Sequence, residues 1–275
     1  MMKGYVLAAL LAGGLAASGP ARSAPLLRVF ISAKQSPART GHKARRMVDD
    51  FWAEIVKRGA ATSAGLVFPT TIQIHNMDVL VFYGDKVFPA RESQRTDLRV
   101  YLQRGGGLVA LHNTVAGPHA ADFAPRLGMT WETNRCHWEG GVVHVRDLDP
   151  NHPITRGLKP FVVADELAVG IRLAPTAHVL ARGAFRGGPA VPIAWTVETD
   201  GQRTVVILLG HNYATFEQPE FRILLCRAMA WAARFDPNTL LLPAERKRFG
   251  EAVPVKKASP VGPPAKPAAT AASAR

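Results

Sequence analysis

The sequence predicts a single α/β domain built on a doubly wound parallel sheet, with a mostly β insertion in its second half. In the first half, short apolar runs alternate with segments of helical period. In the second half, short strand candidates are separated by Gly, Pro and Asp. Alternating strands and helices with short connections are typical of parallel crossovers. We place this domain at residues 25–244, about 220 residues, which suffice for one substantial core.

The first half supplies four strands and two helices. Met47, Phe51 and Ile55 recur every four residues and indicate an amphipathic helix. A second helix ends at Gly105, a residue that often follows a helix C-terminus. The predicted order is strand 26–32, helix 42–59, strands 64–68 and 77–84, helix 90–105 and strand 107–113.

The second half supplies five strand candidates and a closing helix. We expect the last strand to rejoin the main sheet and to lead into a helix that begins near Pro219, since proline suits the first helical turn. The candidates lie at 141–147, 161–167, 177–183, 192–198 and 204–210.

Both ends of the chain differ from the domain in composition. Lys3 followed by the apolar run from Tyr5 to Ala17 is typical of a secretory signal, and the run is shorter than the roughly 20 residues of a membrane span. We therefore expect residues 1–24 to be a cleaved signal peptide and the mature protein to be periplasmic or secreted. Residues 245–275 are rich in Pro, Ala and Lys and predict a disordered tail.

The net charge of +13 does not predict a nucleic-acid partner. Lys3, Arg22 and the tail carry a net +7 of this charge, which leaves +6 for the domain. No Lys/Arg stripe interleaved with aromatic residues is present. The basic tail suits weak contact with an anionic surface. Cys136 and Cys226, the only cysteines, are expected to remain unpaired.

Three histidines are placed where ligands bind in open α/β sheets, outside the carboxyl ends of the strands. His42 follows the first strand, His112 ends the fourth, and His211 ends the last. If the strand order is right, the three converge at one sheet edge. Histidine is the side chain best suited to acid–base work near neutral pH, so the sequence favours a catalytic site here.

Asp165 and Glu166 add neighbouring carboxylates near a strand end. Neighbouring residues of a strand point to opposite faces, so both are not expected in one pocket unless the chain turns. One carboxylate could orient a histidine while the other binds a substrate hydroxyl. Trp138, Trp195 and Tyr213 are candidates to stack on a sugar ring, with a core position as the alternative for each.

The sequence lacks the motifs that are typical of several kinds of functional site. The glycines of GGGLV precede a strand, the wrong order for a phosphate-binding loop, and no G-x-S-x-G indicates a serine hydrolase. No H-x-x-x-H or H-E-x-x-H motif is present, so no metal or other cofactor is expected. A divalent metal on His42, His112, His211 and a carboxylate remains the alternative.

An ordered set of motifs over about residues 26–234 resembles the ThuA-like (trehalose utilisation) family of the class I glutamine amidotransferase-like superfamily. The motifs are TGHK, DVLVFYG, YLQRGGGLVALHN, DPNHPITRGL, ADEL, PIAW, and GQRTVVILLGHN ahead of PEFRILLCRAMAWAA. The resemblance implies a flavodoxin-like fold in which His112 replaces the cysteine nucleophile. It implies a pocket formed by His42, His112, Asp165, Glu166 and His211.

The resemblance also implies sugar catabolism, with glycosides or 3-keto-glycosides as substrates. We assign substrate contacts to Tyr83, Asn113, Trp195, Tyr213 and His137. The chain departs from the family pattern at Ala168, where relatives often have an aromatic residue, and WETNRCHWEGG, which contains His137, matches poorly. The expected partner is a small carbohydrate. The alternatives are a non-catalytic carbohydrate-binding module and a metal-dependent hydrolase.

Overall fold

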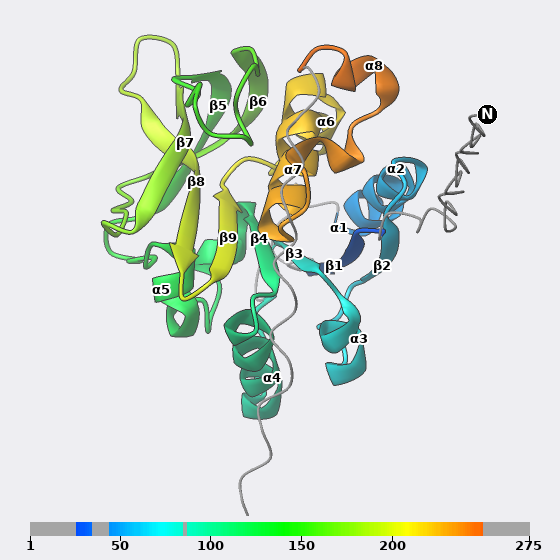
Figure 1. Ribbon diagram of the computed structural model, residues 1–275. Helices are drawn as coiled ribbons and strands as arrows, with labels where there is room; N and C mark the ends of the chain where they lie inside the picture. Colours follow the sequence, from blue (N-terminus) through cyan, green and yellow to red (C-terminus); the bar gives the residue numbers. More distant parts are fainter. Residues whose placement is uncertain (1–25, 35–43, 85–86, 250–275) are drawn as a thin grey trace, which may run out of the picture.

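The computed structural model describes residues 26–34, 44–84 and 87–249. The signal-peptide prediction, His42 and the chain from residue 250 lie outside these ranges. The described strands form one sheet in the order β2-β1-β3-β4-β9-β8-β7-β5-β6 (Figure 1). Its first five strands are parallel: β2 (Ala61–Gly65), β1 (Arg28–Lys34), β3 (Val79–Gly84), β4 (Gly107–Leu111) and β9 (Gln202–Ile207).

The other four strands extend the same sheet with antiparallel pairing. They are β8 (Val191–Thr199), β7 (Ala177–Ala184), β5 (His137–Arg146) and β6 (Phe161–Val169), so β6 forms the far edge. The α/β class is confirmed, and the sheet as a whole is mixed rather than parallel.

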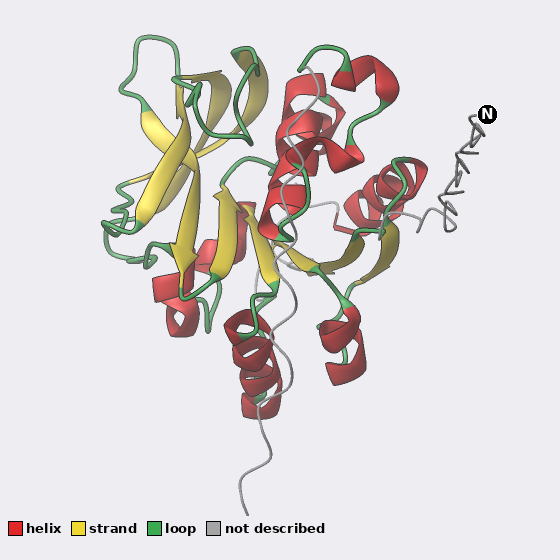
Figure 2. Ribbon diagram, viewed as in Figure 1, coloured by secondary structure: helices red, strands yellow, loops and turns green. Residues whose placement is uncertain are grey.

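Helices cover both faces of the parallel strands (Figure 2). Successive residues of β1 point to opposite faces, so Val29 and Ile31 join one apolar core and Phe30 joins another. The first core also holds residues of α2 and α7, and the second holds residues of α3, α4 and α5. The helices are α1 (Ala44–Arg46), α2 (Trp52–Lys57), α3 (Thr71–Asn76), α4 (Glu92–Gln103), α5 (Ala124–Leu127), α6 (Tyr213–Glu217), α7 (Pro219–Ala232) and α8 (Pro243–Arg246), with a π-helical turn at Met47–Phe51.

The elements predicted at 90–105 and from Pro219 are confirmed as α4 and α7. The strand predicted at 64–68 is wrong in its position, because pairing with β1 starts at Ala61 and Val67 is exposed. Helix α3 was not predicted. Its signal was the capping box between Thr70 and Gln73, in which each residue hydrogen-bonds the backbone of the other.

The chain just past Ala244 contacts the rest of the described structure. Glu245 accepts hydrogen bonds from Arg58, one of them at 2.6 Å, and the Arg227 guanidinium lies 3.8 Å from the centre of the Phe249 ring. These contacts hold the start of the predicted tail against the domain.

Cys136 and Cys226 are both buried and unpaired, as predicted. Burial raises the pKa of the Cys226 thiol to about 12, so this thiol stays protonated near neutral pH.

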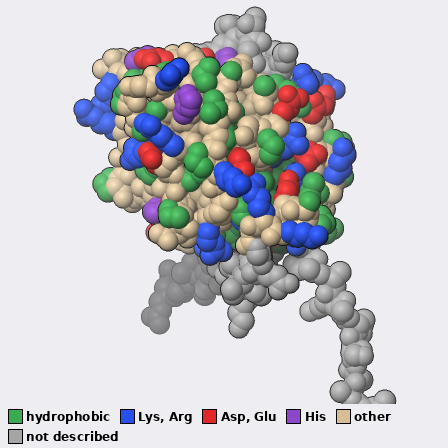
Figure 3. Space-filling model, turned by 90° about the horizontal axis from the view of Figure 1, so that it is seen from above, with side chains coloured by type: hydrophobic (Ala, Val, Ile, Leu, Met, Phe, Trp, Pro, Cys, Tyr) green, Lys and Arg blue, Asp and Glu red, His purple; other side chains and the backbone are tan. Residues whose placement is uncertain are grey.

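Charged side chains of both signs are interspersed on one face of the described surface. Figure 3 shows Lys and Arg side chains at separate places on one face, with Asp and Glu side chains between them. None of the helices within residues 26–34, 44–84 and 87–249 has the length and apolar character needed to cross a membrane.

Candidate functional site

Three of the predicted side chains meet near the carboxyl ends of β4 and β9. Glu166 Oε2 lies 3.1 Å from His211 Nδ1 and 3.6 Å from His112 Nε2, and the two histidine nitrogens are 3.4 Å apart. His112 directly follows β4, His211 lies beyond β9, and Glu166 belongs to β6. The fold therefore joins residues that are up to 99 positions apart in sequence into one cluster, here called the His–Glu cluster.

His112 is held in a strained and wholly buried position. Its φ of 50° lies in the left-handed region, where β4 turns abruptly into a 3-10 turn (His112–Ala116). Such a backbone costs a non-glycine residue of order 1–3 kcal/mol, and strain of this kind gathers at functional sites. A sharp strand-to-helix turn is also how α/β hydrolases expose their nucleophile.

A backbone hydrogen bond orients the imidazole of His112. Its Nδ1 lies 3.0 Å from the carbonyl oxygen of Leu208. A carbonyl only accepts hydrogen bonds, so Nδ1 carries a hydrogen, and Nε2 faces Glu166 and His211. In the neutral form of such a ring, Nε2 carries the lone pair. This orientation suits Nε2 to accept a proton or to bind a cation.

Asp165 holds the backbone of the cluster rather than joining it. Its carboxylate accepts backbone N–H bonds from Glu166 at 2.7 Å, Gly210 at 3.0 Å and His211 at 3.0 Å, together with the Thr215 hydroxyl. Burial raises its pKa, and the four hydrogen bonds oppose that shift. Asp165 and Glu166 point to opposite sides of β6, as the strand period predicts. In this arrangement Asp165 holds the backbones of Glu166 and His211.

Tyr83, predicted to bind substrate, is buried and supports the same loop. Its hydroxyl donates to the carbonyl oxygen of Gly210 at 2.8 Å, and burial raises the pKa of the phenol. Gly210 has a φ of 117°, which L side chains rarely adopt. The turn before His211 thus depends on Gly210, whose backbone is hydrogen-bonded to both Tyr83 and Asp165.

Two tryptophans form a wall beside the cluster. The Trp138 ring lies 4.5 Å from that of His112 and stacks on Trp131 at 5.2 Å, with 20° between the indole planes. Its indole N–H donates to Asn113 Oδ1 at 2.9 Å. Both tryptophans are half-buried, so part of each ring remains accessible. Asn113 therefore positions Trp138, whose importance the sequence did not distinguish from that of other aromatic residues.

Glu166 has an open side across the β5–β6 ladder. Gly140 is its direct partner there, and a Cβ built at Gly140 would meet no atom within 4 Å. A glycine at this register position leaves the same face of the ladder unobstructed.

The remaining predicted residues do not enter the cluster. Trp195, predicted to contact substrate, lies in the second core, where its ring is fully buried and its indole N–H donates to the Leu127 carbonyl. Tyr213 donates to Asp50 at 2.8 Å, and Arg46 lies over its ring at 3.9 Å. His137 is exposed and contacts Glu139 at 2.8 Å.

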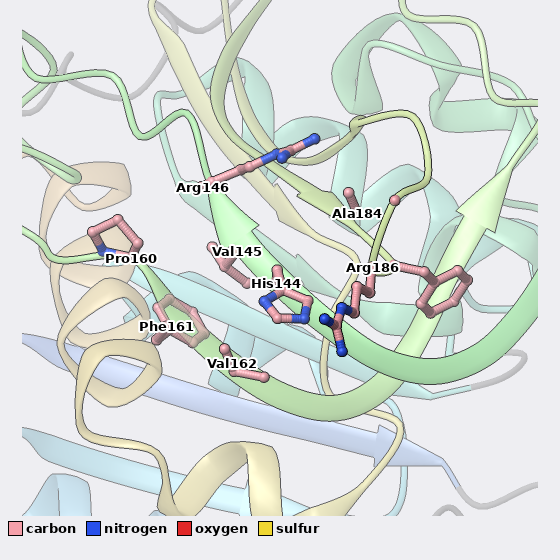
Figure 4. A pocket seen from close by; sticks show the side chains of 10 residues that line it. His144, Val145, Arg146, Pro160, Phe161, Val162, Ala184 and Arg186 are labelled. Carbon is pink, nitrogen blue, oxygen red and sulfur yellow. The ribbon is translucent and has the colours of Figure 1, made fainter.

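A separate cavity of about 370 Å³ lies between β5, β6 and the segment after β7 (Figure 4). Apolar side chains such as Phe161 and Val145 line it together with the basic residues His144, Arg146 and Arg186. It contains no member of the His–Glu cluster.

The chain matches a known protein family. The ThuA family, described as trehalose utilisation, matches residues 38–232, which include all three members of the cluster. None of the curated proteins matches the chain.

Solved structures share the fold at low sequence identity. A ThuA-like protein from Parabacteroides merdae superposes with a TM-score of 0.61 and 16% identity, over 76% of this chain and 90% of that one. A ThuA-like protein from Bacteroides uniformis gives 0.60 and 19%, over 82% of this chain and 100% of that one. A β-galactosidase from Rahnella sp. R3 gives 0.53 and 15%, over 74% of this chain but only 31% of the enzyme. Likeness at this level speaks for fold and not for activity.

Proposed function

Because this chain belongs to the ThuA family of carbohydrate utilisation, we propose that it is an exported enzyme that acts on glycosides or 3-keto-glycosides through the His–Glu cluster. The observation that carries this proposal is the convergence of His112, Glu166 and His211 within hydrogen-bonding or near hydrogen-bonding distance. Either histidine alone would be an ordinary residue near the end of a strand. Together, on a strained and buried turn, they form a site prepared for proton transfer.

The chemistry follows from the acidity of a carbon next to a ketone. In a 3-keto-glycoside, a base removes the proton from C2, and the electron pair of that C–H bond moves toward the carbonyl oxygen. The pair then returns to form a C1–C2 double bond, while the bond from C1 to the glycosidic oxygen breaks and that oxygen takes a proton. Addition of water across the double bond completes a net hydrolysis.

The cluster has a group for each transfer. His112 Nε2 is the proton acceptor, since its ring is oriented by Leu208. His211, held by Glu166, is the donor to the departing oxygen. A well-placed acid or base contributes about 10²–10⁴-fold to the rate.

Trp138 supplies the binding surface in this proposal. An indole face packs against the apolar C–H groups of a pyranose ring, and Trp138 borders both His112 and the accessible Trp131. We further propose that β2-β1-β3-β4-β9 is the flavodoxin-like part of the fold and that β5 to β8 are an insertion in it. Their place between β4 and β9 in the chain supports this.

The proposal can be tested with a panel of disaccharides and their 3-keto forms. Each is incubated with purified protein, its products are analysed, and its binding is measured by calorimetry. Conversion of at least one 3-keto-glycoside is expected. Binding without conversion of any member would instead favour a non-catalytic carbohydrate-binding module.

A further inference from the structure

Three ligand atoms of the His–Glu cluster are arranged like one face of a metal coordination sphere. Their separations of 3.1, 3.4 and 3.6 Å form a nearly equilateral triangle. Tetrahedral coordination with bonds of about 2.0–2.2 Å places neighbouring ligand atoms roughly 3.3–3.6 Å apart. We propose that His112 Nε2, His211 Nδ1 and Glu166 Oε2 bind a divalent first-row transition-metal ion.

The surroundings of the cluster meet the further needs of such a site. The hydrogen bond from His112 Nδ1 to Leu208 fixes the tautomer that offers Nε2 as a ligand, as metal-binding histidines commonly require. Asp165 holds the backbones of both Glu166 and His211, so two of the three ligands are fixed by one carboxylate.

The ligand set indicates the class of metal and leaves room for substrate. Two imidazole nitrogens and one carboxylate oxygen suit zinc, iron, cobalt or manganese better than calcium or magnesium, which prefer oxygen ligands. His112 is fully buried, whereas the side chains of Glu166 and His211 retain 19% and 18% exposure. Three protein ligands leave one position of a tetrahedral ion for water or substrate.

This inference rests on the same site as the proposed function and deepens it. When bound, the ion supplies a Lewis acid for the keto oxygen and makes coordinated water a stronger acid. The bonds broken and formed in the proposed reaction stay the same. With the ion bound, water at the site would transfer the protons in place of His112 and His211.

Metal binding can be measured without any sugar. The full chain, stripped with a chelator, is titrated with Co²⁺ and with Zn²⁺, and the Co²⁺ absorption spectrum reports nitrogen and oxygen coordination. We expect one equivalent to bind. Both His211→Ala and Glu166→Gln should weaken binding by about 100-fold or more, because loss of a group that merely orients a ligand already costs 10–100-fold. His178→Ala is the matched control, since His178 contacts the carboxylate of Asp149 at 2.7 Å outside the cluster.

Binding that is absent, or equally strong in wild type, His211→Ala and Glu166→Gln, would overturn the metal site. The proposed function is judged separately, by turnover of 3-keto-disaccharides in the stripped and the metal-loaded protein. Turnover by stripped protein without metal binding would leave the acid–base proposal standing alone. Metal binding without turnover in either form would keep the metal site and reject the function.

Discussion

The carboxylate of Asp165 accepts a hydrogen bond from the backbone N–H of His211 at 3.0 Å. The same oxygen accepts from the N–H of Glu166 at 2.7 Å. One buried side chain thus fixes two members of the His–Glu cluster that come from different parts of the sheet. The geometry of the site depends on a residue that does not enter it.

Replacing Asp165 by Asn should damage both stability and activity. The amide places a donor where the carboxylate now accepts from Gly210 and Thr215, so one buried group loses its partner. We expect a loss of about 1–3 kcal/mol in the free energy of unfolding. Turnover should fall through kcat more than through KM. Urea unfolding and steady-state kinetics check this, with the exposed Asp49→Asn as control.

Replacing Gly210 by Ala should displace His211. At a φ of 117° the new methyl group is strained, and it would also lie 3.2 Å from the Phe216 ring. We expect a loss of about 1–3 kcal/mol in the free energy of unfolding, together with loss of turnover. Gly201→Ala is the matched control, because its φ is 73° and its Cβ would meet nothing within 4 Å. Equal turnover in both variants would contradict the role given to the Gly210 turn.

Trp138→Ala should weaken sugar binding while the fold persists. Loss of one aromatic contact corresponds to roughly three- to tenfold in affinity. Trp138→Phe keeps a ring but loses the hydrogen bond to Asn113, so it separates stacking from positioning. Calorimetry with the tightest-binding sugar of the panel measures both. Unchanged affinity in Trp138→Ala would remove Trp138 from the binding surface.

His152 should make stability depend on pH at a distance from the cluster. Burial is the main cause that lowers its pKa to about 4, with His178 adding to the shift and Asp149 opposing it. Its ring packs edge-on against Trp231.

The unfolded chain therefore binds more protons than the folded one between about pH 4 and the ordinary histidine pKa of about 6.5. Stability contributed by neutral His152 is present above pH 6.5 and declines as the pH falls toward 4. Since this side chain is only partly buried, we expect His152 to account for a decrease of about 1–2 kcal/mol in the free energy of unfolding over this pH range. Urea unfolding of wild type and of His152→Asn at pH 4.5 and 7 isolates the contribution of His152. An identical pH dependence in the variant would contradict it.

The sequence located much of the site because strand ends are visible in it. Apolar runs mark where strands stop, and the rule for parallel sheets brings His112 and His211 together. The opposite orientations of Asp165 and Glu166 followed from the strand period. The sequence did not separate a core position from a pocket position for Trp195, because a tryptophan in an apolar strand suits both.

Other features depend on contacts that no local pattern records. The antiparallel extension brings Trp138 to His112, and its register places Gly140 opposite Glu166. The strain at His112 arises where a buried strand ends and its side chain bonds to the Leu208 carbonyl. Such pairings are set by tertiary structure, which a single sequence does not display.

The rate at which wild type and His112→Ala convert a 3-keto-disaccharide tests most directly whether His112 carries the proton transfer. His112→Asn serves as a second variant, because asparagine tolerates the left-handed backbone. Circular dichroism confirms that each variant is folded. We expect a loss of at least about 100-fold in both variants if His112 transfers the proton. Conversion at the wild-type rate by either folded variant would contradict this role of His112.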